Sequence, residues 1–484
     1  MKKRNHWISF CLITSAIPAS LAAREWQVPE NVATIQKAID QAEPGDSILV
    51  APGTYAERIR IKPRITLRSR GEDIPGEKGL KRAELTIIDG GGEDGGDSPG
   101  VTMAEGAILD GFTVTGVGTY DDAKWQEARD LKGANQSHEH IGHFGTPGIA
   151  VTAVTCSILN NIVHHNGATG IAIQGKEGKR CAPFISGNAC YRNMGGGIGS
   201  MNGSTAIIDS NTCFENFYAG IGHDNASPHV IHNECYGNIR AGIGVSEGSC
   251  AIVRGNRCYQ NRRAGIGIRT GSSTRPVIED NDCYENDMAG IGVEEEAAPI
   301  IRNNRCHHNQ LAGIGCKEHA NPIIDGNYCY ENKAAGIGTE SSTALIRGNH
   351  CEKNESTGIG ISGTSTALVV GNTCEENRLV AIGIPNGGQA VLHGNTFVRT
   401  GGMPPIVAIL NGSTATLIDN TIRGGGVGAI MLDGELIAIG NTIEGRNGGS
   451  GIVIREKGHA MLSGNSITGY RKPVNEPEKA TVVD

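Results

Sequence analysis

The stretch Asn188-Ala-Cys-Tyr-Arg-Asn193-Met-Gly-Gly-Gly-Ile198 decides the fold, because its spacing recurs nine times along the chain. Each unit has an Asn, a Cys two residues later, a second Asn three residues after the Cys, and an Ile five residues after that. The first Asn of the nine units stands at Asn188, Asn211, Asn233, Asn256, Asn281, Asn304, Asn327, Asn349 and Asn372. A period of 22 to 25 residues with constant internal spacing is typical of stacked coils. The sequence therefore predicts a solenoid that grows by adding coils.

Later coils show which side of each coil faces inward. At the Cys position, two residues after an Asn, they carry Phe397, Ile422, Ile443 and Ile467. An aliphatic residue three positions before each first Asn, and the Ile of each Gly-Ile-Gly, add two further apolar columns. Three short inward-facing strands per coil predict an all-β fold. We expect a single-stranded, right-handed parallel β-helix solenoid, since right-handedness is the usual form.

The Asn and Cys columns each have a structural interpretation. Aligned Asn amides can hydrogen-bond up and down a stack, and Asn also tolerates tight turns. Cysteines in adjacent parallel strands have parallel Cβ vectors about 4.8 Å apart, which suits disulfide geometry poorly. We therefore expect reduced thiols that fill the core at Cys190, Cys213, Cys235, Cys258, Cys283, Cys306, Cys329, Cys351 and Cys374.

Residues 1–22 are typical of a secretory signal. Lys2, Lys3 and Arg4 form a basic start, a short apolar stretch follows, and Ser20-Leu21-Ala22 resembles a cleavage site. The apolar run is too short to span a bilayer. We expect a periplasmic, secreted or cell-surface protein.

The rest of the chain divides into a β-helix over residues 23–469 and a polar, loosely held tail over 470–484. A short amphipathic helix at Val32–Ala42 is expected to cap the N-terminal end of the solenoid. The first strands are predicted at Ser47–Val50, Ile59–Leu67 and Leu85–Gly90.

An insertion over residues 117–147 interrupts the coils, and it suggests a functional arm or lid. Asp121–Leu131 is predicted to include a helix. The histidines that follow, His138, His140 and His143, form a candidate site for a transition metal. An exposed, His-rich loop without a metal is the alternative.

The net charge of −8 argues against nucleic acid or an anionic membrane as the main partner. No segment is long and apolar enough to insert into a membrane. We expect a monomer.

The second Gly of each Gly-Ile-Gly forms an outward column of bare backbone, which would let a ligand approach closely. The alternative is that Gly eases a bend in the chain. Beside it runs a charged band that includes Asp224, Glu247, Arg269, Glu294 and Lys317. Arg269 or Lys317 could act as a catalytic base or charge stabiliser on an acidic substrate, with Glu294 or Asp224 as a Ca²⁺ ligand. A solvated face with charge pairing between strands is the alternative.

Aromatic residues form a further outward column directly after the Cys column. Tyr236, Tyr259 and Tyr284 could stack on sugar rings and so bind substrate together with Asp224 and Glu247. Alternatively, the tyrosines stack on one another and stabilise neighbouring coils.

The repeat, the opening Thr34-Ile-Gln-Lys-Ala-Ile-Asp and the segments Pro52-Gly-Thr-Tyr and Ile87-Ile-Asp-Gly carry a resemblance to a known superfamily. The chain resembles the right-handed parallel β-helix (pectin-lyase-like) superfamily. That superfamily includes pectin and alginate lyases, mannuronan epimerases, periplasmic nitrous-oxide-reductase accessory proteins, and carbohydrate-binding and sugar-hydrolase repeats. The epimerase signature Asp-Pro-His-Asp is absent; the nearest stretch is His223-Asp224-Asn225.

Two hypotheses on function remain open. In the first, the protein is exported and binds or processes a polysaccharide, as a binding protein or as a lyase of uronic acids, an epimerase or a glycoside hydrolase. In the second, it is a non-catalytic surface scaffold or a periplasmic copper-handling accessory protein. A coil repeat by itself specifies only the scaffold, so the site must decide between them.

Overall fold

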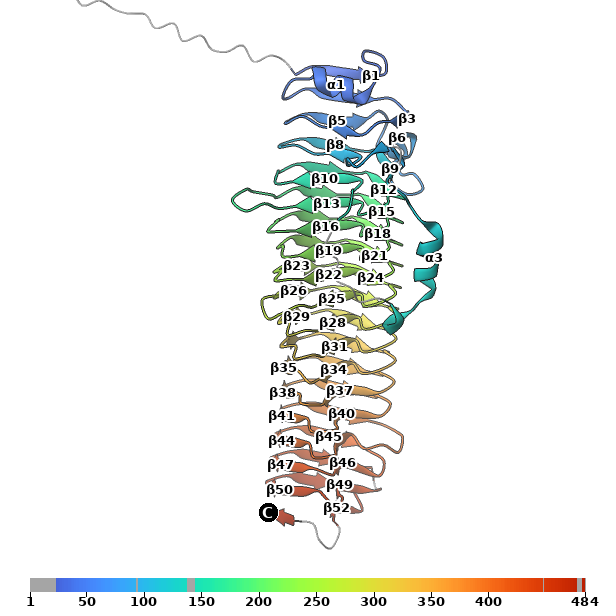
Figure 1. Ribbon diagram of the computed structural model, residues 1–484. Helices are drawn as coiled ribbons and strands as arrows, with labels where there is room; N and C mark the ends of the chain where they lie inside the picture. Colours follow the sequence, from blue (N-terminus) through green and yellow to red (C-terminus); the bar gives the residue numbers. More distant parts are fainter. Residues whose placement is uncertain (1–22, 93–94, 137–143, 447, 477–480, 484) are drawn as a thin grey trace, which may run out of the picture.

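The chain folds into a straight rod of stacked coils, with β1 (Glu25–Val28) near one end and the C-terminal strands at the other (Figure 1). The structure is a computed structural model that describes residues 23–92, 95–136, 144–446, 448–476 and 481–483. The residues of the expected secretory signal lie outside these ranges. Each regular coil contributes one strand to each of three parallel sheets, which we name A, B and C in chain order. The predicted parallel β-helix is confirmed.

Sheet A precedes the first Asn of each repeat, and its strands pair in parallel from coil to coil. Its strands are β1, β2 (Ser47–Val50), β5 (Thr66–Ser69), β8 (Ile108–Asp110), β11 (Ser157–Leu159), β14 (Phe184–Ser186), β17 (Ile207–Asp209), β20 (His229–Ile231), β23 (Ile252–Arg254), β26 (Val277–Glu279), β29 (Ile300–Arg302), β32 (Ile323–Asp325), β35 (Thr343–Arg347), β38 (Thr366–Val370), β41 (Gln389–His393), β44 (Thr414–Ile418), β47 (Glu435–Ile439), β50 (His459–Ser463) and β53 (Thr481–Val483).

Sheet B lies between the two Asn positions and carries the Cys column. Its strands are β3 (Gly53–Ala56), β6 (Thr86–Gly92), β9 (Thr113–Val117), β12 (Ile162–His164), β15 (Ala189–Tyr191), β18 (Thr212–Phe214), β21 (Glu234–Tyr236), β24 (Arg257–Tyr259), β27 (Asp282–Tyr284), β30 (Arg305–His307), β33 (Tyr328–Tyr330), β36 (His350–Glu352), β39 (Thr373–Glu375), β42 (Thr396–Arg399), β45 (Thr421–Gly424), β48 (Thr442–Glu444) and β51 (Ser466–Thr468).

Sheet C follows the second Asn and contains the Gly-Ile-Gly segments. Its strands are β4 (Ile59–Arg60), β7 (Val101–Thr102), β10 (Ile149–Thr152), β13 (Ile171–Gln174), β16 (Ile198–Met201), β19 (Ile221–Asp224), β22 (Ile243–Ser246), β25 (Ile266–Ile268), β28 (Ile291–Val293), β31 (Ile314–Cys316), β34 (Ile337–Glu340), β37 (Thr357–Ser362), β40 (Val380–Ile384), β43 (Val407–Ile409), β46 (Gly428–Leu432), β49 (Ser450–Ile454) and β52 (Lys472–Asn475).

The core of the rod is one continuous apolar column. The nine cysteines of the repeat are fully buried in it, next to the aliphatic residues of sheets A and C. These nine cysteines are free thiols, as predicted. The other cysteines of the described chain are also free, and Cys250 is the exposed one among them. Burial raises the pKa of the Cys235 thiol, so it stays protonated and behaves as a small apolar side chain.

Two ladders of Asn side chains run along the corners of the rod. One joins Asn161 to Asn465 at the turn between sheets A and B, and the other joins Asn166 to Asn377 at the turn between sheets B and C. In both, each Nδ2 donates to the Oδ1 of the Asn in the next coil, at 2.8–3.1 Å. The amide ladder that the aligned Asn positions suggested is therefore present.

Asn261 shows why the ladder residue must be Asn. Its Nδ2 donates to the carbonyl of Cys235 (3.1 Å) and to Oδ1 of Asn286 (3.0 Å). Its Oδ1 accepts from the backbone N (3.1 Å) and Nδ2 (3.0 Å) of Asn238. One buried side chain thus satisfies two donors and two acceptors, and it links three successive coils.

Asn261→Ala should lower stability by about 3 kcal/mol or more, because it leaves buried polar groups of the adjacent coils without partners. The shift in the urea denaturation midpoint measures this loss. Asn321→Ala, at an exposed position, should leave the midpoint nearly unchanged. Equal midpoints for the two variants would show that the ladder contributes little to stability.

One helix caps the N-terminal end of the rod, and the others lie on its outside. Helix α1 (Ile35–Gln41) lies within the predicted Val32–Ala42 segment and buries Ile35, Ala38 and Ile39 on the first coils. Thr34 caps it by accepting from the backbone N of Lys37. Helix α2 (Lys81–Leu85) lies immediately before β6.

The insertion contains helix α3 (Asp122–Asp130), inside the predicted helical segment, and the short 3₁₀ helix η2 (Gly133–Asn135). No helix of the described chain is long and apolar enough to cross a membrane.

Three predicted segments differ in detail. Ile59–Leu67 forms two strands, β4 and β5, because the chain turns a corner between sheets C and A. Leu85 ends helix α2, so the strand predicted from Leu85 begins at Thr86. The region expected to be a loose tail contributes β52 and β53, and Val474 packs on the core.

Candidate functional site

A long groove of about 720 Å³ follows the outer face of sheet C. Its floor is the second Gly of the Gly-Ile-Gly repeat, and in nine successive coils this position carries no side chain. The floor positions are Gly199, Gly222, Gly244, Gly267, Gly292, Gly315, Gly338, Gly360 and Gly383. With coils about 4.8 Å apart, the floor is about 40 Å long.

The Gly before each Ile and the floor Gly after it are present for different reasons. At the Gly before the Ile, a Cβ atom would collide with the fold: at Gly265 it would lie 2.7 Å from the Gly290 carbonyl oxygen and 2.8 Å from Nδ2 of Asn286. At the floor positions from Gly222 to Gly338 a Cβ atom has room. Its nearest neighbour at Gly267 is Cβ of Ala241, 3.6 Å away, and at Gly222 nothing lies within 4 Å. The packing of the rod therefore requires the first Gly column and not the floor column.

Coils on either side of the nine glycines show that the fold accepts side chains at the floor position. The same register carries Ala172 before the glycines, and Ala408, Met431 and Val453 after them. The bare strip is therefore a local feature of nine coils. A bend in the strand, the structural explanation considered for this column, would apply equally to the outer coils.

One wall of the groove, which we call the charged wall, follows the floor on its C-terminal side. It carries Asp224, Ser246, Arg269, Glu294, Lys317 and Glu340 from successive coils. The opposite wall consists of an Ala column topped by Tyr218, Arg240, Arg263, Met288 and Leu311. The structure thus brings Asp224, Arg269, Glu294 and Lys317 together, as the charged band predicted.

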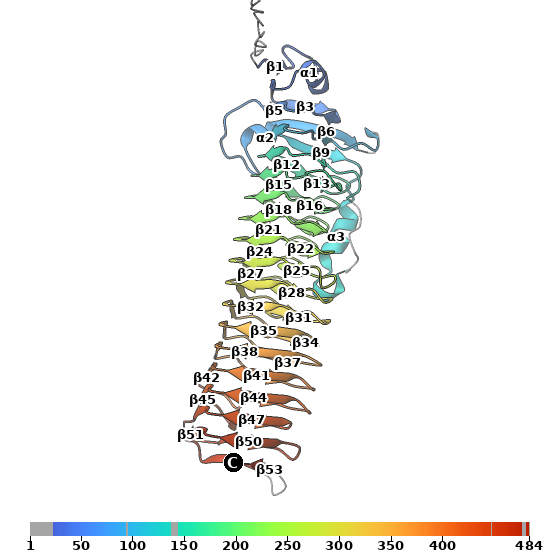
Figure 2. The same ribbon diagram turned by 90° about the vertical axis from the view of Figure 1, so that its left-hand side faces the viewer.

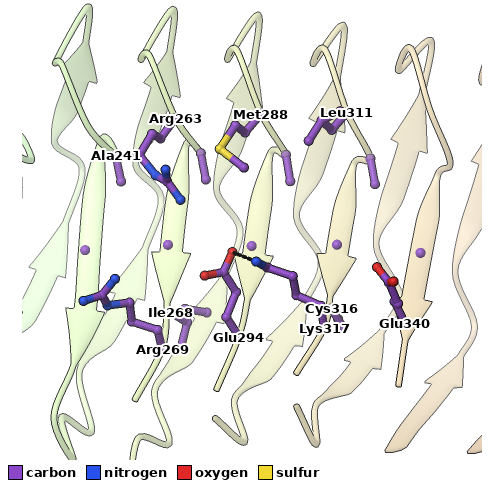
Figure 3. A pocket seen from close by; sticks show the side chains of 18 of the residues that line it. Ala241, Arg263, Ile268, Arg269, Met288, Glu294, Leu311, Cys316, Lys317 and Glu340 are labelled. Atoms are coloured by element: carbon purple, nitrogen blue, oxygen red, sulfur yellow. Dashed lines mark ion pairs between the residues drawn. The ribbon is translucent and has the colours of Figure 1, made fainter. Parts of the chain in front are cut away.

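Arg263 and Arg269 belong to the same coil and lie on opposite sides of the floor (Figure 3). Burial lowers the pKa of Arg263; the nearby Glu294 carboxylate opposes this, and the charge of Arg269 adds to it. Nη1 of Arg263 donates to the carbonyl of Gln136 at 3.1 Å. Two guanidinium groups thus flank the floor at Gly267, an arrangement that suits an anionic group of a ligand.

Glu294 and Lys317 form an ion pair across neighbouring coils, with Oε1 and Nζ 3.4 Å apart (Figure 3). Burial alone would lower the pKa of Lys317, but the Glu318 and Glu294 carboxylates outweigh it and raise the pKa. Lys317 is therefore a cation at neutral pH, as is Arg269, and both suit charge stabilisation better than proton abstraction.

Three carboxylates gather beside the charged wall, and Glu294 is the one among them that lines the groove. Ligand oxygens of Glu294, Glu295 and Glu318 lie within 4.8 Å of one another, a set of hard oxygen donors that fits Ca²⁺. The Lys317 ammonium group pairs with Glu294 and Glu318, so it competes with a metal ion for these carboxylates.

Helix α3 of the insertion lies along the corner between sheets B and C (Figure 2). Trp125 of α3 is fully buried, its Nε1 donates to the Glu215 carbonyl at 2.7 Å, and the guanidinium of Arg192 lies 4.3 Å from its ring centroid. Beyond the helix, the backbone N of Gly133 donates to the Arg262 carbonyl. The predicted metal ligands His138, His140 and His143 lie outside the described residues.

Phe144, at the end of the insertion, closes one end of the groove. A side chain at Gly199 would collide with its ring, and its carbonyl accepts from the backbone N of Thr169 at 3.2 Å. The first floor position is thus covered by an aromatic ring, and the open floor begins at Gly222.

The tyrosines predicted to bind substrate lie on a different face. Tyr236, Tyr259 and Tyr284 project from sheet B, and their ring centroids are 5.0 and 4.9 Å apart with planes within 10°. Each ring of this stack covers the face of the next, so the rings support one another, the structural alternative considered for them. Glu247, in the turn after β22, also does not line the groove.

The wall residues Arg240, Arg263 and Met288 were missed by the sequence prediction. A signal was available, because each stands two residues after the second Asn of its repeat. The residue type in this column differs from coil to coil, so the column cannot be recognised by a conserved repeat residue.

Comparison with solved structures finds other β-helix proteins at low identity. The A-module of mannuronan C-5 epimerase AlgE6 from Azotobacter vinelandii is 13% identical, with a TM-score of 0.38, over 93% of each chain. A mutant of the periplasmic alginate epimerase AlgG is 12% identical, with a TM-score of 0.39, over 74% of this chain and 80% of that one. Tailspike gp49 of Acinetobacter baumannii bacteriophage Fri1, a capsular polysaccharide depolymerase, is 11% identical, with a TM-score of 0.34, over 70% and 58%. Likeness at this level says nothing about the activity of this chain.

A sequence comparison with curated proteins finds no match. The family model described as "Right handed beta helix region" matches residues 134–277 and 267–403, more than half of the chain. The chain therefore belongs to the right-handed β-helix family.

Proposed function

We propose that the protein is exported and binds an acidic polysaccharide, which lies along the glycine floor of sheet C. The observation that supports this most strongly is a row of glycines that the packing of the rod does not require. Gly in a strand interior costs stability relative to a residue with a side chain. A functional reason for the bare floor is the close approach of a ligand.

The geometry of the floor favours a polymer with a repeating unit. Strands of sheet C run across the rod, so a ligand that follows the groove crosses one strand after another at steps of about 4.8 Å. From Gly222 to Gly338 it meets the same Gly backbone and the same Ala wall in each coil. A repeating surface of this length matches an extended chain of similar units better than a compact small molecule.

The chemistry of the walls favours an acidic sugar. The Gly and Ala surface is apolar and flat enough for the C–H faces of sugar rings, while the charged wall offers hydrogen-bonding partners for hydroxyl groups. Arg263 and Arg269 flank the floor and would bind a carboxylate or sulfate group. Lys317 adds a further cation two coils further on.

A second candidate function is processing of the same polymer by a lyase of uronic acids. The grouping of Glu294, Glu295 and Glu318 favours it, since Ca²⁺ bound there could neutralise a sugar carboxylate. Ultraviolet absorbance of an unsaturated product that appears only with Ca²⁺ would support it. If an acidic polymer binds and no such product appears, the protein binds the polymer without cleaving it.

Gly292→Val should block the ligand without harming the fold. The side chain copies Val453, which stands at the same position in an outer coil, so we expect an unchanged or slightly raised thermal midpoint. Affinity for an acidic polysaccharide, chosen by screening pectate, alginate and glycosaminoglycans, should fall at least about ten-fold, or about 1.4 kcal/mol. Met431→Val, outside the groove, is the matched control. Equal affinity of both variants would exclude the floor as the binding surface.

Arg269→Gln should weaken binding of the acidic polymer about ten-fold and reduce the salt dependence of its affinity, because one cation that faces the anionic group is lost. Affinity measured at several ionic strengths tests this. Arg275→Gln removes the same charge from an exposed loop position that does not line the groove. If both substitutions change the affinity equally, net charge and not the groove attracts the ligand.

A further inference from the structure

Outside the groove, two adjacent histidines at the end of β30 face each other on sheet B. The Nδ1 atoms of His307 and His308 are 2.8 Å apart, and the ring planes are nearly perpendicular, at 83°. The side chain of His307 is 14% exposed and that of His308 is 51% exposed, so solvent and ions reach the pair.

A carboxylate at the Nε2 edge of each ring determines which ring nitrogen carries the proton. Nε2 of His307 lies 3.1 Å from Oδ1 of Asp282, and Nε2 of His308 lies 2.9 Å from Oε2 of Glu331. A carboxylate accepts hydrogen bonds, so each Nε2 carries a proton and donates. In the neutral rings both Nδ1 atoms then present lone pairs, and these point at each other across 2.8 Å. Only a cation between them makes this contact favourable: a shared proton or a metal ion.

The rings are also held in position. His307 is part of the aromatic column, stacked between Tyr284 and Tyr330 with centroid distances of 5.1 and 4.6 Å. The backbone of His308 is left-handed, with a φ of 55°, which turns its ring back towards His307. The two Nδ1 atoms are therefore preorganised by stacking, by backbone geometry and by two carboxylates.

We propose that His307 and His308 form a binding site for a divalent transition-metal ion, with both Nδ1 atoms as ligands. Imidazole suits Zn²⁺ and Cu²⁺, and Zn–N bonds of about 2.0–2.1 Å require the two nitrogens to separate by only about half an ångström. Asp282 and Glu331 would orient the ligands, as carboxylates commonly do for metal-bound histidines. Water would complete the coordination, and binding would release any proton that the pair shares.

Two substitutions taken from the chain itself remove the ligands with little disturbance. His307→Tyr and His308→Gln recreate the pair Tyr259-Gln260, which occupies the same positions two coils earlier. The ring stack is kept in the double variant. His232→Gln is the control, since His232 is an exposed histidine that also faces a carboxylate, Asp209, at 3.2 Å.

Zn²⁺ titration of the full protein by calorimetry tests the proposal. The double variant should bind one equivalent fewer than the unmodified protein and the His232→Gln control, and the Zn²⁺-dependent rise of its thermal midpoint should shrink. Midpoints without metal show whether the variant is folded. A folded double variant that binds as many equivalents of Zn²⁺, with the same affinity, would overturn the proposal. The result is independent of any polysaccharide binding.

Discussion

The hydrogen bond from one Asn amide to the next is the interaction on which the rest of the structure depends. Buried amides such as Asn238, Asn261 and Asn286 satisfy one another and the backbone at the corner of each coil. This pairing holds the coils in register, and from Gly148 to Gly358 it leaves room only for Gly just before the Ile of sheet C. Once the corners are satisfied, the outer faces of the strands are free to vary, and function can be placed there.

The Asn ladder explains one of the two Gly columns of sheet C, and it does not explain the glycine floor. Gly265 is required by the ladder and Gly267 is not, although both belong to one Gly-Ile-Gly segment. The outer coils, with Met431 and Val453 at the floor position, show what the same fold carries where no ligand is expected. A rigid, periodic rod also presents its groove preorganised, so little ordering is needed when a polymer binds.

The sequence predicted the scaffold well because the same packing contacts recur in every coil and select the same residue type at each repeat position. Columns of Cys, Ile and Asn have one residue type each, set by the same contacts in every coil. The charged residues Arg269, Glu294 and Lys317 could be placed on one face by register alone. Which aromatic faces stay open could not be predicted, since Tyr259 is covered by its neighbours through stacking that spacing does not reveal. The opposing wall at Arg263 was missed because its column has no constant residue, and the contact of Phe144 with Gly199 depends on the path of the insertion.

The central claim is that a polymer lies on the glycine floor. A crystal structure with a bound acidic oligosaccharide tests it most directly. We predict sugar rings over sheet C between Gly222 and Gly338, with an anionic group between Arg263 and Arg269. An oligosaccharide bound on the tyrosine column of sheet B, with the glycine floor empty, would contradict the account.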